Sequence, residues 1–130
     1  MIVHPAVIVH GLGDARAALA PGLAVTLVSA PGAALFAGCL WWREVVAMAG
    51  AEHPATPVTD VLDCADASGL AMSALRSGIN CLVLWPDAPG WAAVAAVAAE
   101  RGGAVLAEAP PALDLAQRGA IRRLHRWLAR

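Results

Sequence analysis

The stretch AVIVHGLGD, residues 6–14, is a short apolar run that ends in a polar, glycine-rich turn. Four consecutive apolar residues without polar alternation are typical of a strand that is covered on both faces, as in a parallel sheet. A turn after such a strand lies at its carboxyl end, where open parallel sheets bind their ligands. The stretch therefore predicts an architecture and also the place on it where a site would lie.

Four further apolar runs alternate with segments of helical pattern. The predicted strands are residues 6–9, 23–29, 58–64, 79–85 and 104–109, and the predicted helices are residues 14–20, 31–50, 68–77, 90–101 and 112–129. Strict alternation predicts a mainly parallel sheet with right-handed crossovers. We expect one α/β domain over residues 1–130, a three-layer, doubly wound domain of flavodoxin-like or Rossmann-like type with about five strands. The first crossover is barely long enough for parallel pairing, so a hairpin there is the alternative.

The chain contains no lysine, because all nine of its basic residues are arginine. This excludes Schiff-base and pyridoxal chemistry, which need a lysine amine. It also excludes a complete G-x-x-x-x-G-K-[ST] phosphate loop, and it counts against an active response-regulator receiver. Hydrophobic residues make up 59% of the chain and charged residues 15%, which predicts a globular protein rather than a disordered one.

Cys39, Cys64 and Cys81 lie far apart and form no C-x-x-C pair. This spacing predicts neither a disulfide framework nor a metal site, and it fits a reducing, cytoplasmic setting. The first residues also lack the basic leader and cleavage site of a secreted protein. Residues 17–42 carry no charge, but two Pro-Gly pairs divide them into pieces shorter than the roughly 20 residues of a membrane-spanning helix, so no membrane span is expected.

The loops at the carboxyl ends of the predicted strands form an acidic rim. We expect a small polar ligand to bind there, in a cleft lined by His10, Gly11, Gly13, Asp14, Asp63, Asp66, Ser68 and Asp87. The carboxylates would repel a phosphate, and GLGDAR lacks the third glycine of a dinucleotide fingerprint. No cofactor is therefore expected.

Each of these polar residues also has a structural explanation. Asp14 would cap the short helix that follows it, and Asp66 or Ser68 would cap the helix after the third strand. Ser29 would cap the helix over residues 31–50. His10 would act as a base or nucleophile, or simply hydrogen-bond its neighbours. Cys64 is expected to be structural, because the adjacent Asp63 would raise the pKa of its thiol.

The residues IVHG, 8–11, resemble the phosphorylated-histidine region of mannose-type sugar phosphotransferase IIA domains, which are also small α/β domains. The resemblance covers only these residues. The residues DCADASG, 63–69, do not reproduce the glycine-rich turn that the family has after its third strand. The resemblance implies that His10 would carry a phosphoryl group.

The predicted helix over residues 31–50 is apolar in almost every direction, with only Arg43 and Glu44 interrupting. A helix that is apolar on all sides must be buried on all sides. We expect a second copy of the chain to cover it, giving a homodimer or higher oligomer in which Trp41 or Trp42 anchors the interface. The alternative is a helix buried within its own core.

The predicted C-terminal helix carries five arginines opposite an apolar stripe. These leave the rest of the chain with four arginines against ten acidic residues. We interpret it as a surface helix that faces an acidic body, and we expect neither nucleic-acid nor membrane binding.

Together these features predict a non-enzymatic, self-associating binding or assembly module with a polar ligand cleft. The alternative is a small enzyme or phosphocarrier that uses His10 with nearby carboxylates.

Overall fold

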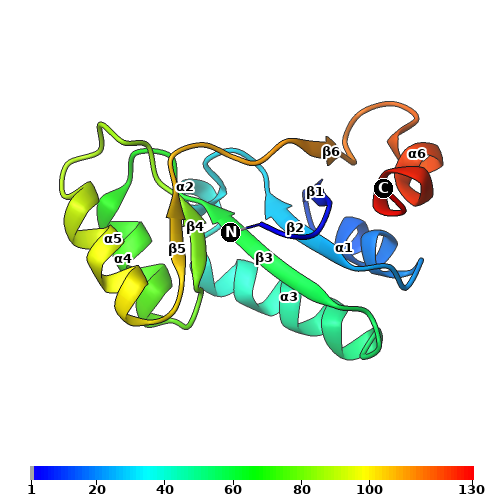
Figure 1. Cartoon of the computed structure of the whole chain (residues 1–130), viewed down its shortest axis with the longest axis horizontal. Helices are drawn as coiled ribbons and strands as arrows, with labels where there is room; N and C mark the ends of the chain where they lie inside the picture. Colours follow the sequence, from blue (N-terminus) through cyan, green and yellow to red (C-terminus); the bar gives the residue numbers. More distant parts are fainter. Residues whose placement is uncertain (1) are drawn as a thin grey trace.

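The computed structural model describes residues 2–130, which form one parallel β-sheet with helices between its strands (Figure 1). The strands are β1 (Ala6–Val9), β2 (Val25–Ser29), β3 (Val58–Asp63), β4 (Cys81–Val83), β5 (Ala104–Leu106) and β6 (Ala112–Asp114). The helices are α1 (Leu12–Leu19), α2 (Ala33–Phe36), α3 (Cys39–Glu52), α4 (Ser68–Arg76), α5 (Trp91–Glu100) and α6 (Ala120–Leu128). The predicted α/β class with a parallel sheet is confirmed.

The strands lie in the order β5-β4-β3-β2-β1-β6, and all neighbours run parallel. Ala6 of β1 stands in register with Thr26 of β2 on one side and with Ala112 of β6 on the other. The hairpin alternative for the first connection is therefore wrong. Every residue of β2 is buried, as its continuous apolar run predicts for an inner strand.

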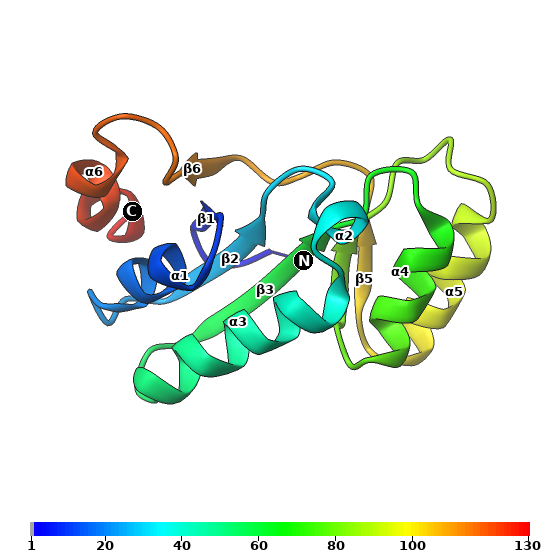
Figure 2. The same cartoon turned by 180° about the vertical axis from the view of Figure 1, so that it is seen from behind.

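The two faces of the sheet are covered by different parts of the chain. On one face, side chains from α1, α3, α4, α5 and α6 join strand residues such as Leu27 and Leu62 in one apolar cluster. On the other face, Ile2 packs against a small cluster whose buried members all come from strands: Ala6, Val28, Val61 and Val83. β3 passes in front of α3 in Figure 1 and behind it in Figure 2. The helices thus gather on one face, and an extended N-terminal segment crosses the other. A doubly wound domain as expected from the sequence has helices on both faces; here the strands from β1 to β5 follow one another in one direction, so right-handed crossovers place their helices on the same face.

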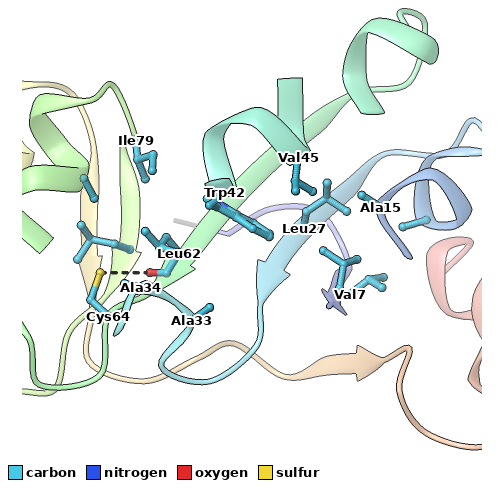
Figure 3. Close-up of a cluster of buried hydrophobic side chains, with 14 of the residues drawn as sticks. Val7, Ala15, Leu27, Ala33, Ala34, Trp42, Val45, Leu62, Cys64 and Ile79 are labelled. Atoms are coloured by element: carbon cyan, nitrogen blue, oxygen red, sulfur yellow. Dashed lines mark hydrogen bonds between the residues drawn. The ribbon is translucent and has the colours of Figure 1, made fainter. Parts of the chain in front are cut away.

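Trp42 is the largest fully buried side chain of this core. Figure 3 shows its ring beside Val45 and Leu27, between α3 and the sheet. Its indole Nε1 donates a hydrogen bond to Oδ2 of Asp60 at 3.1 Å, which satisfies its polar atom. Trp41 is half-buried, with its ring centroid 6.1 Å from that of Trp42.

The continuous helix predicted over residues 31–50 is wrong, because two glycines interrupt it. Gly32 precedes α2 with a φ of 68°, and Gly38 separates α2 from α3 with a φ of 86°. Both values lie in the left-handed region, which glycine adopts without steric strain. The chain therefore turns between α2 and α3, and the two helices present different side chains to solvent.

The helix predicted over residues 112–129 is also wrong in its first half. Residues Ala112–Asp114 form β6, and the helix begins only at Ala120, after Gly119 with a φ of 79°. The sheet therefore has six strands rather than about five. The connection from β5 runs from one edge of the sheet to the other, and β6 pairs with the edge of β1 (Figure 1).

Candidate functional site

The junction of β1 and β6 is where strand order in the sheet departs from order in the sequence. The chain leaves β1 through α1 and enters β2 on one side, while β6 lies on the other side of β1. In open parallel sheets, ligands bind beyond the carboxyl ends of the strands at such a switch in strand order. The residues that follow β1 and end β6 are therefore the first candidates for a site.

His10 and Asp114 meet at this junction. Nε2 of His10 lies 2.7 Å from Oδ1 of Asp114, and the two side chains are 37% and 28% exposed. The same carboxylate oxygen accepts the backbone N–H of Ala116 at 2.9 Å. Partial burial pushes the pKa of Asp114 upward, but the hydrogen bonds from Ala116 and His10 and the charge of His10 outweigh it, so that this pKa is lowered. Asp114 is thus a carboxylate at neutral pH.

The carboxylate of Asp114 fixes the proton on the imidazole ring of His10. A carboxylate only accepts hydrogen bonds, so Nε2 must carry the hydrogen and donate it. In the neutral ring, Nδ1 then holds a free lone pair. No residue among 2–130 donates a hydrogen bond to this nitrogen. When the ring is neutral, the pair therefore presents one acceptor nitrogen for a ligand, held in a fixed orientation.

Asp14 approaches the same junction from α1. It is the third residue of the helix, and its Oδ2 accepts the backbone N–H of His10 at 2.9 Å. The predicted cap is wrong in its geometry, because Gly11 is the N-cap residue and no side chain caps it. Asp14 instead reaches back and fixes the turn that carries His10. At Gly11 and Gly13, an added Cβ would meet nothing within 4 Å, so the turn borders open space.

Asp63 anchors two loops and is 5% exposed. Its Oδ1 accepts the backbone N–H groups of Gly32 at 3.1 Å and Ala65 at 3.0 Å. Ser29, predicted as a helix cap, instead accepts the backbone N–H of Asp63 through its Oγ at 2.9 Å. These contacts join the loops after β2 and β3 and support the positive φ of 50° at Ala65. The carboxylate of Asp63 thus serves as a hydrogen-bond acceptor for the backbone of its own chain.

The remaining predicted residues follow β3 and β4. The Ser68 hydroxyl donates to the Pro89 carbonyl, and no side chain caps α4, so the predicted caps by Asp66 or Ser68 are wrong. Asp66 and Asp87 are exposed. Cys64 is fully buried, and burial, together with the charges of Asp63 and Cys39, raises the pKa of its thiol to about 12. This cysteine is no nucleophile at neutral pH, as its sequence context predicts.

The predicted residues therefore fall into two groups. His10, Gly11, Gly13 and Asp14 lie together at the β1 end, and Asp63, Asp66, Ser68 and Asp87 follow β3 and β4. β1 and β3 are two strands apart, about 10 Å at ordinary strand spacing. Asp114, the partner of His10, is absent from the sequence prediction, because residue 114 was assigned to a helix. The signal available in the sequence was Asp114 at the end of the run ALD, which directly follows Pro110 and Pro111.

The fold and this junction define a parallel α/β domain with a histidine–aspartate pair at the switch in strand order. No protein-family model matches the chain, and no curated protein matches it. In the part of the chain that the structure describes, no group of three or more His, Cys, Asp and Glu side chains could hold a metal ion. Across residues 2–130, no helix is both long and apolar enough to span a membrane.

Proposed function

We propose that this protein is a binding module that holds a small polar ligand at the junction of β1 and β6. The observation that carries the proposal is the 2.7 Å contact between His10 and Asp114, which leaves Nδ1 of the ring free and oriented. A base or ligand-binding histidine needs such an orienting partner, whereas a histidine kept only for packing does not need an open nitrogen. Binding is the simpler role, because neither buried polar residue after β3 is free to act as a second catalytic group: Asp63 holds two backbone N–H groups, and burial raises the pKa of the Cys64 thiol to about 12.

The charges at the junction favour one class of ligand. Nδ1 accepts a hydrogen bond, and the carboxylates of Asp14 and Asp114 stand on either side of His10 in its hydrogen-bond network. A phosphate or carboxylate would be repelled by these charges, whereas the ammonium group of a protonated amine carries three N–H donors, one for each of the three acceptors. We therefore propose a small amine or amino sugar as the ligand.

The test is a titration of uniformly ¹⁵N-labelled protein with putrescine, ethanolamine and glucosamine, followed by amide and imidazole NMR shifts. We expect shifts at His10, Gly11 and Gly13 with one of these compounds. The variants His10→Ala and Asp114→Asn should abolish them. Asp87→Asn, an exposed carboxylate of the other group, is the matched control and should leave them unchanged. Shifts that stay away from the β1 turn, or that survive His10→Ala, contradict the proposal.

A second function, that of a small enzyme or phosphocarrier, has one observation in its favour. An imidazole whose Nε2–H is held by a carboxylate has its Nδ1 lone pair ready for attack or proton transfer. The test is incubation with acetyl phosphate, followed by intact mass measurement and peptide mapping. A phosphoryl group on His10 that Asp114→Asn prevents would favour the carrier. An unmodified chain favours the binding module.

We also propose that two copies of the chain associate through α2 and the outer face of α3. Leu35, Phe36, Leu40 and Met48 are 54%, 72%, 57% and 46% exposed, respectively. Contiguous apolar side chains of this size on small proteins commonly mark an interface. Trp42 is buried in its own core and Trp41 is half-buried, so Phe36 replaces the tryptophans as the expected anchor.

Light scattering at low micromolar concentration tests this association. A species of twice 13.2 kDa is expected, and Phe36→Glu with Leu40→Glu should convert it to a monomer. Ile121→Glu, an equally exposed apolar residue on α6, is the control. A monomeric wild type contradicts the proposal.

For the cellular compartment we propose the cytoplasm, because Cys39, Cys64 and Cys81 are free thiols.

A further inference from the structure

The arginines of the C-terminal region form no ion pair within the described part of the chain. Three ion pairs join side chains in residues 2–130: His10 with Asp114, Arg16 with Glu52, and Arg43 with Glu44. None involves Arg118, Arg122, Arg123, Arg126 or Arg130. The interpretation that these arginines face the acidic body of their own chain is therefore not supported by any close contact. The guanidinium of Arg130 lies over the ring of Trp127, 4.1 Å from its centroid, and the charges of the other four arginines are open to a partner.

Three of these arginines line one hollow surface. A cleft of about 530 Å³ lies between the outer edge of β6 and α6, lined by Arg123, Arg126 and Arg130 together with Leu113 and Trp127. A second cleft of about 370 Å³ shares Trp127 and Arg130 and continues past Pro110 and Pro111. We call these two clefts together the β6 groove. One end of it is basic and the other is apolar.

The floor of the β6 groove includes an unpaired sheet edge. β6 is the last strand of the sheet and pairs only with β1 among the described strands. The Leu115 N–H donates to Ile8 O at 3.1 Å, toward β1. Because backbone groups alternate in direction along a strand, the N–H groups of Ala112 and Asp114 point to the open edge. The carbonyl of Asp114 already accepts the N–H of Gln117 at 3.0 Å, so Ala112 offers both of its backbone groups to one more strand and Asp114 offers its N–H.

We propose that the β6 groove binds an extended acidic peptide segment of another protein. The backbone of the peptide adds a seventh strand to β6, and its carboxylates contact Arg123 and Arg126. Its apolar side chains reach the end of the groove formed by Pro110 and Pro111. Main-chain pairing supplies affinity, and the arginines supply selectivity.

Charge argues against a second copy of this chain as the occupant. Edge-to-edge pairing of two β6 strands about a twofold axis would bring two arginine-rich α6 helices together. Like charges in such an interface are strongly unfavourable. A free anion could accept from the guanidinium groups and from an open N–H group, but it has no N–H of its own to donate to the carbonyl of Ala112, which points to the same edge. The peptide is the occupant that uses both features.

The experiment measures fluorescence anisotropy of a dye-labelled peptide of alternating glutamate and valine with blocked ends. The groove variant Arg123→Glu/Arg126→Glu should bind at least about tenfold more weakly than the wild type. The matched control Arg118→Glu/Arg122→Glu makes the same change of charge just before α6 and in its first turn, outside the groove, and should stay within about threefold. All four side chains are exposed, so we expect both variants to fold, and far-UV circular dichroism checks this.

Two further measurements separate strand addition from simple charge attraction. The same peptide with N-methylated amides keeps its charge but cannot pair with β6, so it should bind about tenfold more weakly or worse. Hydrogen exchange at Ala112 and Asp114 should slow in the complex. Three outcomes overturn the proposal: equal losses in both arginine variants, undiminished binding of the N-methylated peptide, or displacement of the peptide by phosphatidylglycerol vesicles or a DNA duplex at equal charge concentration.

Discussion

The contact between Trp42 and Asp60 allows a prediction whose size follows from the structure. In Trp42→Phe the buried indole loses part of its volume and its only polar atom, which donates to Asp60. A cavity of about 40 Å³ costs roughly 1 kcal/mol in free energy of unfolding. The lost hydrogen bond to a carboxylate adds about 1.5–3 kcal/mol. We expect the variant to lose about 3 kcal/mol and to remain folded, because domains of this size have about 5–15 kcal/mol.

A second substitution separates the two contributions. In Asp60→Asn the acceptor oxygen remains but carries no charge, so Trp42→Phe should cost about 1 kcal/mol less in this background. The coupling should also depend on pH. Burial raises the pKa of Asp60, and the hydrogen bond from Trp42 opposes that rise. The folded state therefore holds this proton more tightly than the unfolded state, and stability is lost as the pH rises through the pKa of the folded protein.

Urea denaturation followed by far-UV circular dichroism measures all four members of this cycle, at pH 7 and at pH 3.5. Asp60→Asn alone should gain stability relative to the wild type at pH 7 more than at pH 3.5. A loss below about 1 kcal/mol for Trp42→Phe, or the same loss in both backgrounds, would refute the reasoning, since the buried hydrogen bond would then contribute nothing.

Three other predictions concern a lowered carboxyl pKa, a close backbone contact and a buried thiol. The lowered pKa of Asp114 stabilises the folded protein above the ordinary carboxyl pKa, and this stability is lost as the pH falls through the pKa of Asp114 in the folded protein. The thermal midpoint of Asp114→Asn should therefore fall less than that of the wild type below about pH 4, and parallel curves of midpoint against pH would contradict this. An alanine at Gly103 would place its Cβ 1.9 Å from the carbonyl oxygen of Asn80, so Gly103→Ala should lower the free energy of unfolding by about 3 kcal/mol or more in urea denaturation. Gly69→Ala, which has open space in α4, should raise it by about 0.5–1 kcal/mol, and equal effects of the two variants would contradict the close contact at Gly103. Iodoacetamide at pH 8 should leave Cys64 unmodified until urea unfolds the chain, because its thiol is buried and has a pKa of about 12. Peptide mass mapping measures the labelling, and modification of Cys64 in the native protein would contradict its burial.

The sequence predicted those elements whose patterns are local. The apolar runs of β1 and β2 carry their own signal, since inner parallel strands are covered on both faces. The break between α2 and α3 was missed because Gly38 stands in an apolar stretch that keeps a helical period on both sides. β6 was missed for a different reason. Three residues are too few to show a strand period, and this strand exists because the edge of β1 receives it.

The candidate site was predictable in part for the same reasons. The rule that ligands lie beyond strand ends found His10, Asp14 and Asp63. It did not separate them, because the role of each depends on a partner elsewhere in the chain. Asp63 is occupied by the amide of Gly32, from the neighbouring loop, while His10 depends on Asp114. Such partners follow from strand order, which local patterns do not encode.

The separation of 104 positions between His10 and Asp114 has a consequence for synthesis on the ribosome. While the chain is being translated, β1 through β5 emerge first, and β1 then has an open edge where β6 will pair. Unpaired edges of nascent sheets are prone to aggregation. Until residue 114 has left the exit tunnel, His10 has no carboxylate to orient it. Incomplete chains thus lack the assembled pair, and only a protein in which β6 has docked can present His10 in the orientation that the proposed ligand requires.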